Sequence, residues 1–187
     1  MTYDDETPTP VGIVPVDARG SMPFSLLHGE SLVAVASWAM GDAGIDLLDF
    51  DASWADVQAR DAALVVHDPL CPGTPAWFIA EAVRVAAERD VVVAGVRPVT
   101  DTVKTTDGEV LGDSVDRAGL LAVSSPVVIP ASVVATLSGL PSTDDLADLV
   151  AGLRESHEVS FVEAPPAARR VSDESDLRLV ESLASAG

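Results

Sequence analysis

Cysteine, lysine and histidine are scarce in this chain of 187 residues. The single cysteine, Cys71, excludes an internal disulfide, and the three scattered histidines lack the spacing of zinc ligands. Only Lys104 among the 11 basic residues is a lysine, whereas 30 residues are acidic, and the formal net charge is −19. Because this charge repels phosphate backbones and anionic lipid, we expect no nucleic-acid and no membrane partner. The acidity is typical of a solvated surface, and a high-salt cytoplasm would favour it equally.

Long apolar runs are also lacking. No run of about 18 apolar residues occurs, and the opening MTYDDETPTP is acidic where a signal peptide is basic and then apolar. We therefore expect a cytoplasmic protein. The length fits one domain, so the chain is interpreted as a flexible acidic tail over residues 1–10 and a single domain over residues 11–187.

Strand patterns alternate with helix patterns along most of the chain. The segment 62–68, AALVVHD, is the clearest buried strand, since it is apolar on both faces. Thr74 is expected to cap the next helix with Pro75 in its first turn, and Ser142 with Asp145 to form a capping box. Other strands are expected over 11–16, 91–99, 121–128 and 159–164, and other helices over 29–41 and 130–138 and from Ser172.

Residues 100–121 do not continue this alternation. Short β-prone pieces, TVKT and EVL, flank a Thr-Asp-Gly turn, which predicts a hairpin-like excursion. The alternation in the rest of the chain favours a three-layer α/β domain with a mostly parallel sheet. The functional site of such a domain lies at the carboxyl ends of the strands.

Four motifs together resemble one known family. VVHDPLCP is similar to the pattern V-H-D-A-A-R-P, and RRVSDESDL is similar to F-K-I-T-x-x-x-D-L. Between them, PVTDTVKTTDGEVLGDSVDRAGLLAVSSP is similar to P-x-x-D-T-[IL]-K followed by an arginine and Q-T-P-Q, and a TDD triplet follows at 143–145. Their order and spacing over 65–177 resemble the 2-C-methyl-D-erythritol 4-phosphate cytidylyltransferases of the non-mevalonate isoprenoid pathway.

The resemblance implies a Rossmann-like three-layer sandwich in which the segment 100–121 is an arm that embraces a second subunit in a homodimer. It implies a nucleotidyltransferase that joins CTP to methylerythritol phosphate and releases pyrophosphate, the substrate phosphate attacking the α-phosphorus in line. Mg²⁺ is the implied cofactor. Such a step depends on cations and a metal that hold several negative charges together.

Matched position by position, the resemblance assigns roles to five residues. Asp68 stands for the aspartate that binds magnesium and substrate, and a single carboxylate with waters suits that ion. Thr102 and Arg117 match arm residues that reach the substrate phosphate of the neighbouring subunit. Arg170 stands for a phosphate-binding lysine, and Ser125 replaces a substrate-binding threonine. Two alternatives stay open: Asp68 is equally a structural relic, and Thr102 and Arg117 could serve only to stabilise a dimer.

The loop after the first strand departs most from the family. The family pattern there is A-A-G-x-G-x-R-[ML] followed by P-K, whose amides and cations hold the triphosphate. The stretch 14–27, VPVDARGSMPFSLL, keeps one glycine, has no lysine and places Asp17, which repels a triphosphate, where a small residue stands. Arg19 is the candidate for the catalytic loop arginine. Cys71 replaces another family arginine, and we expect the family's next strand and helix to be missing from the short segment 41–60.

The number of retained cations differs between the nucleotide side and the substrate-phosphate side of the implied site. A site of this family presents roughly five cations and a metal, each charge-assisted contact being worth about 1.5 to 3 kcal/mol. Arg117 and Arg170 remain at matching positions. Losing the others costs about 5 kcal/mol or more, which is several powers of ten in rate. The losses fall on the nucleotide side, so CTP binding is doubtful, whereas the side that binds the substrate phosphate is better kept.

Three other features invite a chemical role, and each has a simpler alternative. His67 ends a buried strand, where a packed or hydrogen-bonded histidine is the commoner case. Cys71 has no basic neighbour in sequence that would activate it. The triplet Asp49-Phe50-Asp51 is similar to the D-x-D metal pair of some glycosyltransferases, but such a triplet arises easily in so acidic a chain.

Three functions remain, and we prefer the first. It is a diverged, shortened homologue, a possible pseudoenzyme weak or inactive in CMP transfer, that dimerises and binds a phosphorylated polyol or sugar. The second is an active cytidylyltransferase with a remodelled loop, and the third is a non-catalytic dimer partner of an intact family enzyme. Turnover separates the second from the others, and binding of a phosphate ligand by the chain alone separates the first from the third.

Overall fold

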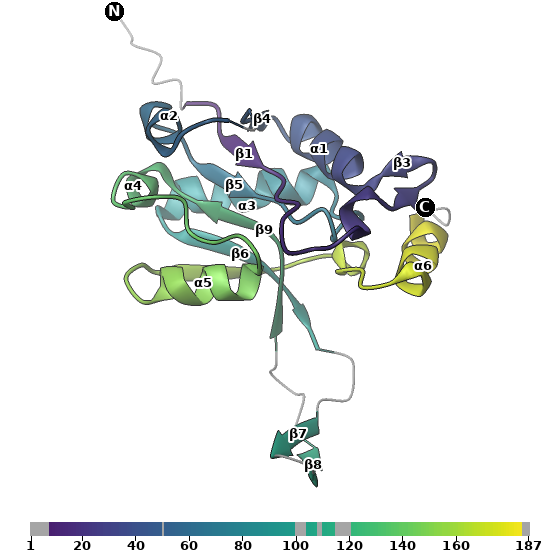
Figure 1. The fold of residues 1–187 in the computed structure, drawn as a ribbon. Coiled ribbons are helices and arrows are strands. Elements are labelled where there is room, and N and C mark those ends of the chain that lie inside the picture. The colour runs from purple at the N-terminus through teal and green to yellow at the C-terminus, as the bar shows by residue number, and fades with distance from the viewer. Residues whose placement is uncertain (1–7, 50, 100–103, 108–109, 115–120, 185–187) are drawn as a thin grey trace, which may run out of the picture.

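The computed structural model of the chain describes residues 8–49, 51–99, 104–107, 110–114 and 121–184. Six strands form one sheet in the order β10–β6–β9–β5–β1–β4 (Figure 1). Their bounds are β1 (Val11–Ile13), β4 (Asp46–Leu47), β5 (Leu64–Val66), β6 (Val92–Pro98), β9 (Leu121–Ile129) and β10 (Val159–Glu163). Strand β1 is parallel to β4 and β5, β6 is parallel to β10, and β9 is antiparallel to β5 and β6. The expected α/β domain with a mostly parallel sheet is confirmed.

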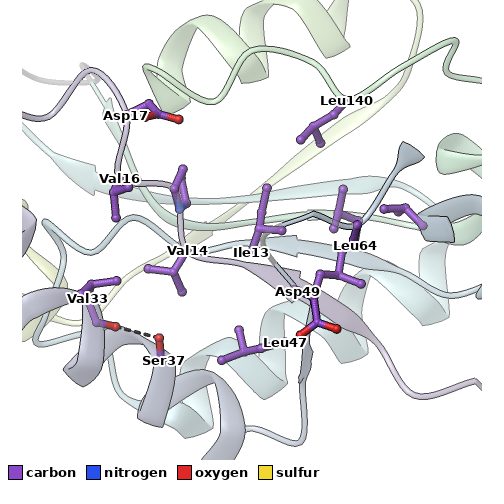
Figure 2. A pocket seen from close by; sticks show the side chains of 15 residues that line it. Ile13, Val14, Val16, Asp17, Val33, Ser37, Leu47, Asp49, Leu64 and Leu140 are labelled. Carbon is purple, nitrogen blue, oxygen red and sulfur yellow. Dashed lines mark hydrogen bonds between the residues drawn. The ribbon is translucent and has the colours of Figure 1, made fainter. Parts of the chain in front are cut away.

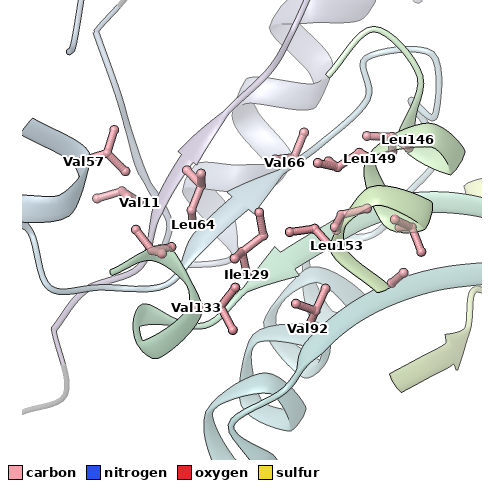
Figure 3. Close-up of a cluster of buried hydrophobic side chains, with 14 residues drawn as sticks. Val11, Val57, Leu64, Val66, Val92, Ile129, Val133, Leu146, Leu149 and Leu153 are labelled. Carbon is pink, nitrogen blue, oxygen red and sulfur yellow. The ribbon is translucent and has the colours of Figure 1, made fainter. Parts of the chain in front are cut away.

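Helices cover both faces of the sheet. Helices α1 (Leu32–Asp42) and α3 (Ala76–Arg89) lie on one face, where their apolar side chains form a cluster with Val65 of β5. The other face carries α2 (Trp54–Ala59), α4 (Ala131–Val134) and α5 (Leu146–Arg154). Figure 3 shows the cluster on that face, which includes Leu64 and Val66 of β5. Successive residues of a strand face opposite sides, so an uninterrupted apolar strand is what two covered faces require.

The order in which the chain adds strands to the sheet reverses at β1. The chain leaves β1, passes through α1 to the edge strand β4, and returns through α2 to β5 on the other side of β1. In open α/β sheets, the crevice outside the carboxyl ends of the strands at such a point is the usual ligand site. Gly12 allows α1 to pack closely here, because a Cβ at this position would come 2.2 Å from Met40 Cε and 2.6 Å from Ile45 Cγ2.

Shorter elements complete the described chain. They are η1 (Met22–Phe24), β2 (Leu26–Leu27), β3 (Glu30–Ser31), η2 (Pro166–Ala168), α6 (Glu174–Ala184), β7 (Lys104–Asp107) and β8 (Val110–Ser114). Strands β7 and β8 pair antiparallel, as the hairpin-like excursion predicts, and Figure 1 draws them beyond the ends of β6 and β9. Thr102 and Arg117, the two predicted site residues of the arm, lie outside the described residues.

Three local predictions are wrong. Pro75, not Thr74, is the N-cap of α3, because the Thr74 hydroxyl donates to the carbonyl of Cys71 instead (2.8 Å). Helix α5 starts only at Leu146, because Asp145 alone accepts from its first amides. The strand and helix expected to be missing from 41–60 are present in short form as β4 and α2.

None of the helices in the described part of the chain is long and apolar enough to cross a membrane.

Candidate ligand-binding site at the carboxyl edge of the sheet

Asp68 lies just beyond the carboxyl end of β5, and only 2% of its surface is exposed. Its Oδ1 accepts hydrogen bonds from Arg19 Nε (2.8 Å) and from the backbone N–H of Leu70 (3.0 Å). Its Oδ2 accepts from Arg170 Nε at 3.2 Å. Asp68 therefore forms two ion pairs within the protein, one with a fully buried guanidinium and one with a side chain that is 47% exposed.

The loop after β1 aims Arg19 inward. Ala18 adopts the left-handed conformation (φ 58°), which costs a residue with a Cβ roughly 1 to 2 kcal/mol. The guanidinium of Arg19 then donates to the carbonyls of Asp17 (2.7 Å) and Thr143 (2.8 Å) in addition to Asp68. The candidate loop arginine thus joins three segments, since it connects its own loop to the end of β5 and to the residues before α5.

His67 and Ser125 form a buried pair behind Asp68. The Ser125 hydroxyl accepts the Asp68 backbone N–H at 3.0 Å and is hydrogen-bonded to His67 Nδ1. Burial lowers the pKa of His67 to about 4, although the charge of Asp68 opposes the shift. His67 is therefore a neutral, packed residue, as its simpler alternative proposed. Ser125 is 0% exposed, and its predicted substrate contact stays a prediction. Its neighbour Ser124 lines the adjacent hollows.

Cys71 is a buried residue in the turn after β5. Burial raises the pKa of its thiol to about 12, and the nearby negative charge of Asp68 adds to the shift. Since the thiolate is the reactive form, this environment does not support a nucleophilic cysteine.

The described residues do not fit a magnesium site at Asp68. A carboxylate ligand must offer free lone pairs to the ion, and the Asp68 oxygens already accept three donors, two of which are cationic. Over the described ranges, no group of three His, Cys, Asp or Glu side chains is placed to hold a metal ion. In this arrangement, Arg19 and Arg170 supply the positive charge that an ion would bring.

Three arginines gather at the ends of β6 and β9. Arg97, Arg169 and Arg170 line a hollow of about 230 Å³, and its described lining includes no acidic residue. Arg97 donates to the Pro165 carbonyl (2.6 Å). Arg169 donates through Nη2 to Asp176 Oδ1 (2.9 Å), whereas its buried Nε has no hydrogen-bond partner among the described residues. We call this cavity the basic hollow. Of these three arginines, the sequence motifs assigned a phosphate-binding role only to Arg170. Arg169 could have been found because it directly precedes Arg170 in the sequence.

A second cavity adjoins the basic hollow. It measures about 290 Å³, shares Ala122–Ser124 and Arg170 with the basic hollow, and extends to Asp68 and the first residues of α5. The segment that carries Arg169 and Arg170 is held tightly, because a Cβ on Gly73 would come 2.2 Å from the Ala167 carbonyl oxygen. The two cavities therefore adjoin beside β9, and the second has both polar residues and apolar residues such as Leu121 and Leu146 in its lining.

The crevice beside β1 has a different lining. It is a cavity of about 340 Å³ between the loop after β1, helix α1 and the segment after β4. Figure 2 shows apolar side chains such as Ile13, Leu64 and Leu140 around it, with the carboxylates of Asp17 and Asp49. We call this cavity the β1 crevice. Its described lining includes no basic residue. Of the triplet Asp49-Phe50-Asp51, Asp49 lines the cavity and Asp51 does not, while residue 50 lies outside the described residues.

A solved structure shares the fold of this chain. The crystal structure of 2-C-methyl-D-erythritol 4-phosphate cytidylyltransferase from Thermus thermophilus matches it with a TM-score of 0.65 at 24% identity, covering 94% of this chain and 98% of that one. The chain therefore has the α/β fold of the nucleotidyltransferases.

Sequence relatives identify the family. The chain is 32% identical over 147 residues to the 2-C-methyl-D-erythritol 4-phosphate cytidylyltransferase of Corynebacterium efficiens, and the alignment covers 71% of this chain and 57% of that protein. It is 30% identical over 133 residues to the protein of the same name from Bacillus velezensis, covering 68% and 56%. No protein-family model matches the chain. The chain belongs to the 2-C-methyl-D-erythritol 4-phosphate cytidylyltransferase family, as its motifs predict, and it spans little more than half the length of these relatives.

Proposed function

We propose that this protein is a diverged member of its family that binds a phosphorylated polyol or sugar in the basic hollow and is weak or inactive in CMP transfer. The observation that carries this proposal is the hollow itself. In a chain with only 11 basic residues and a net charge of −19, three arginines line one cavity.

The basic hollow suits a phosphate. Each charge-assisted hydrogen bond from a guanidinium to a phosphate oxygen is worth about 1.5 to 3 kcal/mol, and arginine offers paired donors in a fixed plane. The unpartnered Nε of Arg169 supports the same interpretation, because a buried N–H without an acceptor costs about 1 to 3 kcal/mol that a ligand oxygen would recover. The adjoining cavity provides room for a small polyol beside the phosphate.

The β1 crevice does not suit a triphosphate. Asp17 and Asp49 line it without any basic residue among the described lining, so an anion bound there meets only repulsion. Arg19, the arginine of the loop after β1, donates its hydrogen bonds inside the protein, to Asp68 and to two backbone carbonyls. These features support a protein that has kept the phosphate side of the family site without its nucleotide side.

Isothermal titration calorimetry with 2-C-methyl-D-erythritol 4-phosphate tests the proposal. We expect saturable binding, weakened about tenfold or more in Arg97→Ala, since one charge-assisted contact is lost. Arg154→Ala is the matched control: Arg154 lies over the Phe161 ring (5.7 Å), does not line either cavity, and should leave the affinity unchanged.

CTP is the second probe. We expect it to bind at least a hundredfold more weakly than the polyol phosphate. Micromolar or tighter CTP binding would favour an active enzyme with a remodelled loop, and no binding of either ligand would favour a non-catalytic partner of an intact family enzyme.

Pairing of two copies through residues 100–121, which carry Thr102 and Arg117, belongs to the same proposal. Light scattering should give twice the chain mass of 19.3 kDa. A strictly monomeric protein would remove this part of the proposal and leave the phosphate site of the single chain to stand alone.

A further inference from the structure

The β1 crevice has the dimensions and the position of a small-molecule site. Its volume of about 340 Å³ falls in the range of ligand pockets, roughly 300 to 1,000 Å³. It lies at the carboxyl end of β1, where the chain turns to β4 on one side and to β5 on the other. This is the topological switch point of the sheet, and such points are where α/β folds bind ligands.

The side chains that line the crevice offer hydrogen-bond acceptors but no free donor. Its polar side chains in the described chain are Asp17, Asp49 and Ser37. The Ser37 hydroxyl donates to the Val33 carbonyl at 2.7 Å, as Figure 2 shows, so that only its lone pairs remain. Both carboxylates are exposed and make no ion pair or side-chain hydrogen bond with another described residue. A ligand that satisfies this lining must bring donors and, preferably, positive charge.

The remaining lining is apolar and partly uncovered. Leu47 is 40% exposed and Leu140 is 46% exposed, although both border the same cavity. Figure 2 shows Ile13, Leu64 and Leu140 around the space with Asp17 and Asp49 at different places on its border. A ligand with an aliphatic or aromatic body would remove this apolar surface from water, at about 25 cal/mol per Å².

We propose that the β1 crevice binds a small organic cation, an amine with an apolar body whose ammonium group reaches Asp17 or Asp49. The apolar walls hold the body, and the carboxylates and the net charge of −19 select positive over negative charge. The site is separate from the basic hollow, with which it shares no described lining residue. The inference therefore does not depend on the proposed function.

Three probes of one length test the inference: hexylamine, hexan-1-ol and hexanoate, each titrated at neutral pH and followed by methyl NMR of the protein. We expect saturable shifts at the methyl groups of Leu47, Leu140 and Ile13 with hexylamine, weaker shifts with hexan-1-ol and none with hexanoate. Equal affinities of the three probes, or shifts spread over the surface, would overturn the inference.

Variants test the role of the carboxylates. Asp17→Asn and Asp49→Asn should each weaken hexylamine binding about two- to fivefold, the scale of one exposed charge pair. Asp51→Asn removes the same charge from a neighbouring exposed position that does not line the crevice, and should leave the affinity unchanged. An equal loss in all three variants would mean that hexylamine follows only the general negative field, which would contradict a site. Ala52→Phe, which fills the crevice, should abolish the binding while the basic hollow keeps its ligand.

Discussion

The β1 crevice and the basic hollow lie along the same edge of one sheet, on either side of β5, yet their linings have opposite charge. The crevice is bordered by two carboxylates and no described base, whereas the hollow is bordered by three arginines and no described acid. Strand β5 runs between them, and Asp68, just beyond its carboxyl end, is paired with Arg19 from the crevice side and Arg170 from the hollow side. The difference indicates that the two cavities suit ligands of opposite charge, although they lie on one sheet edge.

The Arg19–Asp68 ion pair connects the loop after β1 to the end of β5. A loop arginine that faces a ligand must remain free, but here its donors are distributed over Asp68 and two carbonyls. The same contact occupies the carboxylate that the family resemblance assigns to magnesium. One buried ion pair thus engages both the loop arginine and the carboxylate.

The largest effect is expected for Arg19→Met, which should lower the free energy of unfolding by about 3 to 5 kcal/mol, because it leaves Asp68 buried with a single half-exposed partner. Urea denaturation measures the change. Arg60→Met is the control, since the Arg60–Asp46 pair is 55% exposed at both side chains and should contribute less than about 1 kcal/mol. Similar losses in the two variants would refute the central role of Arg19.

The buried His67 should make stability depend on pH. Its pKa is lowered to about 4 in the folded protein from an ordinary value of 6.5, so the unfolded chain binds its proton first as the pH falls. The free energy of unfolding should therefore drop by about 3 kcal/mol between pH 6.5 and 4 on account of this residue. His67→Asn should remove that part of the slope, while the exposed His28→Gln should not. A pH dependence identical in wild type and His67→Asn would exclude this origin.

Gly73→Ala should damage the basic hollow from a distance. Its Cβ would overlap the Ala167 carbonyl, and overpacking of this kind costs about 1 to 3 kcal/mol. Because the displaced segment carries Arg169 and Arg170, the affinity for the polyol phosphate should fall while hexylamine binding in the β1 crevice is retained. Gly139→Ala, which meets nothing within 4 Å, is the control. Equal loss of both ligands would show that the two cavities are not independent.

The smallest effect concerns metal. Mn²⁺ titrations followed by electron paramagnetic resonance should give the same number of bound ions for wild type and Asp68→Asn, because the Asp68 oxygens are already occupied by donors. Likewise, EDTA should leave the calorimetric affinity for the polyol phosphate unchanged. A specific Mn²⁺ site that Asp68→Asn removes would contradict the ion-pair assignment.

The fold was largely predictable from the sequence, because buried parallel strands such as 62–68 are uninterrupted apolar runs and the intervening helices are amphipathic. Asp68 could also be placed at a strand end. The ion-pair partners of Asp68 could not be predicted, because Arg19 is 49 positions away in the sequence and Arg170 is 102 positions away. The role of Arg97 could not be predicted either, because Arg97 belongs to no motif and reaches the hollow only because the end of β6 pairs with the start of β9.

The predicted starts of α3 and α5 are wrong for a local reason. Several capping residues compete within a few positions, and the side chain that meets an acceptor elsewhere does not cap. Thr74 turns to the Cys71 carbonyl and leaves the start of α3 to Pro75, while Asp145 caps α5 without Ser142. Such choices depend on the neighbouring turn and not on the composition of the helix itself.

Pyrophosphate release from CTP, Mg²⁺ and 2-C-methyl-D-erythritol 4-phosphate tests the central claim most directly. With a preparation that binds the polyol phosphate in calorimetry, we expect no pyrophosphate above a reaction without protein, because no basic residue is in the described lining of the β1 crevice and Arg19 donates inside the protein. Robust turnover that Asp68→Ala abolishes would contradict the account and establish an active cytidylyltransferase with a remodelled loop.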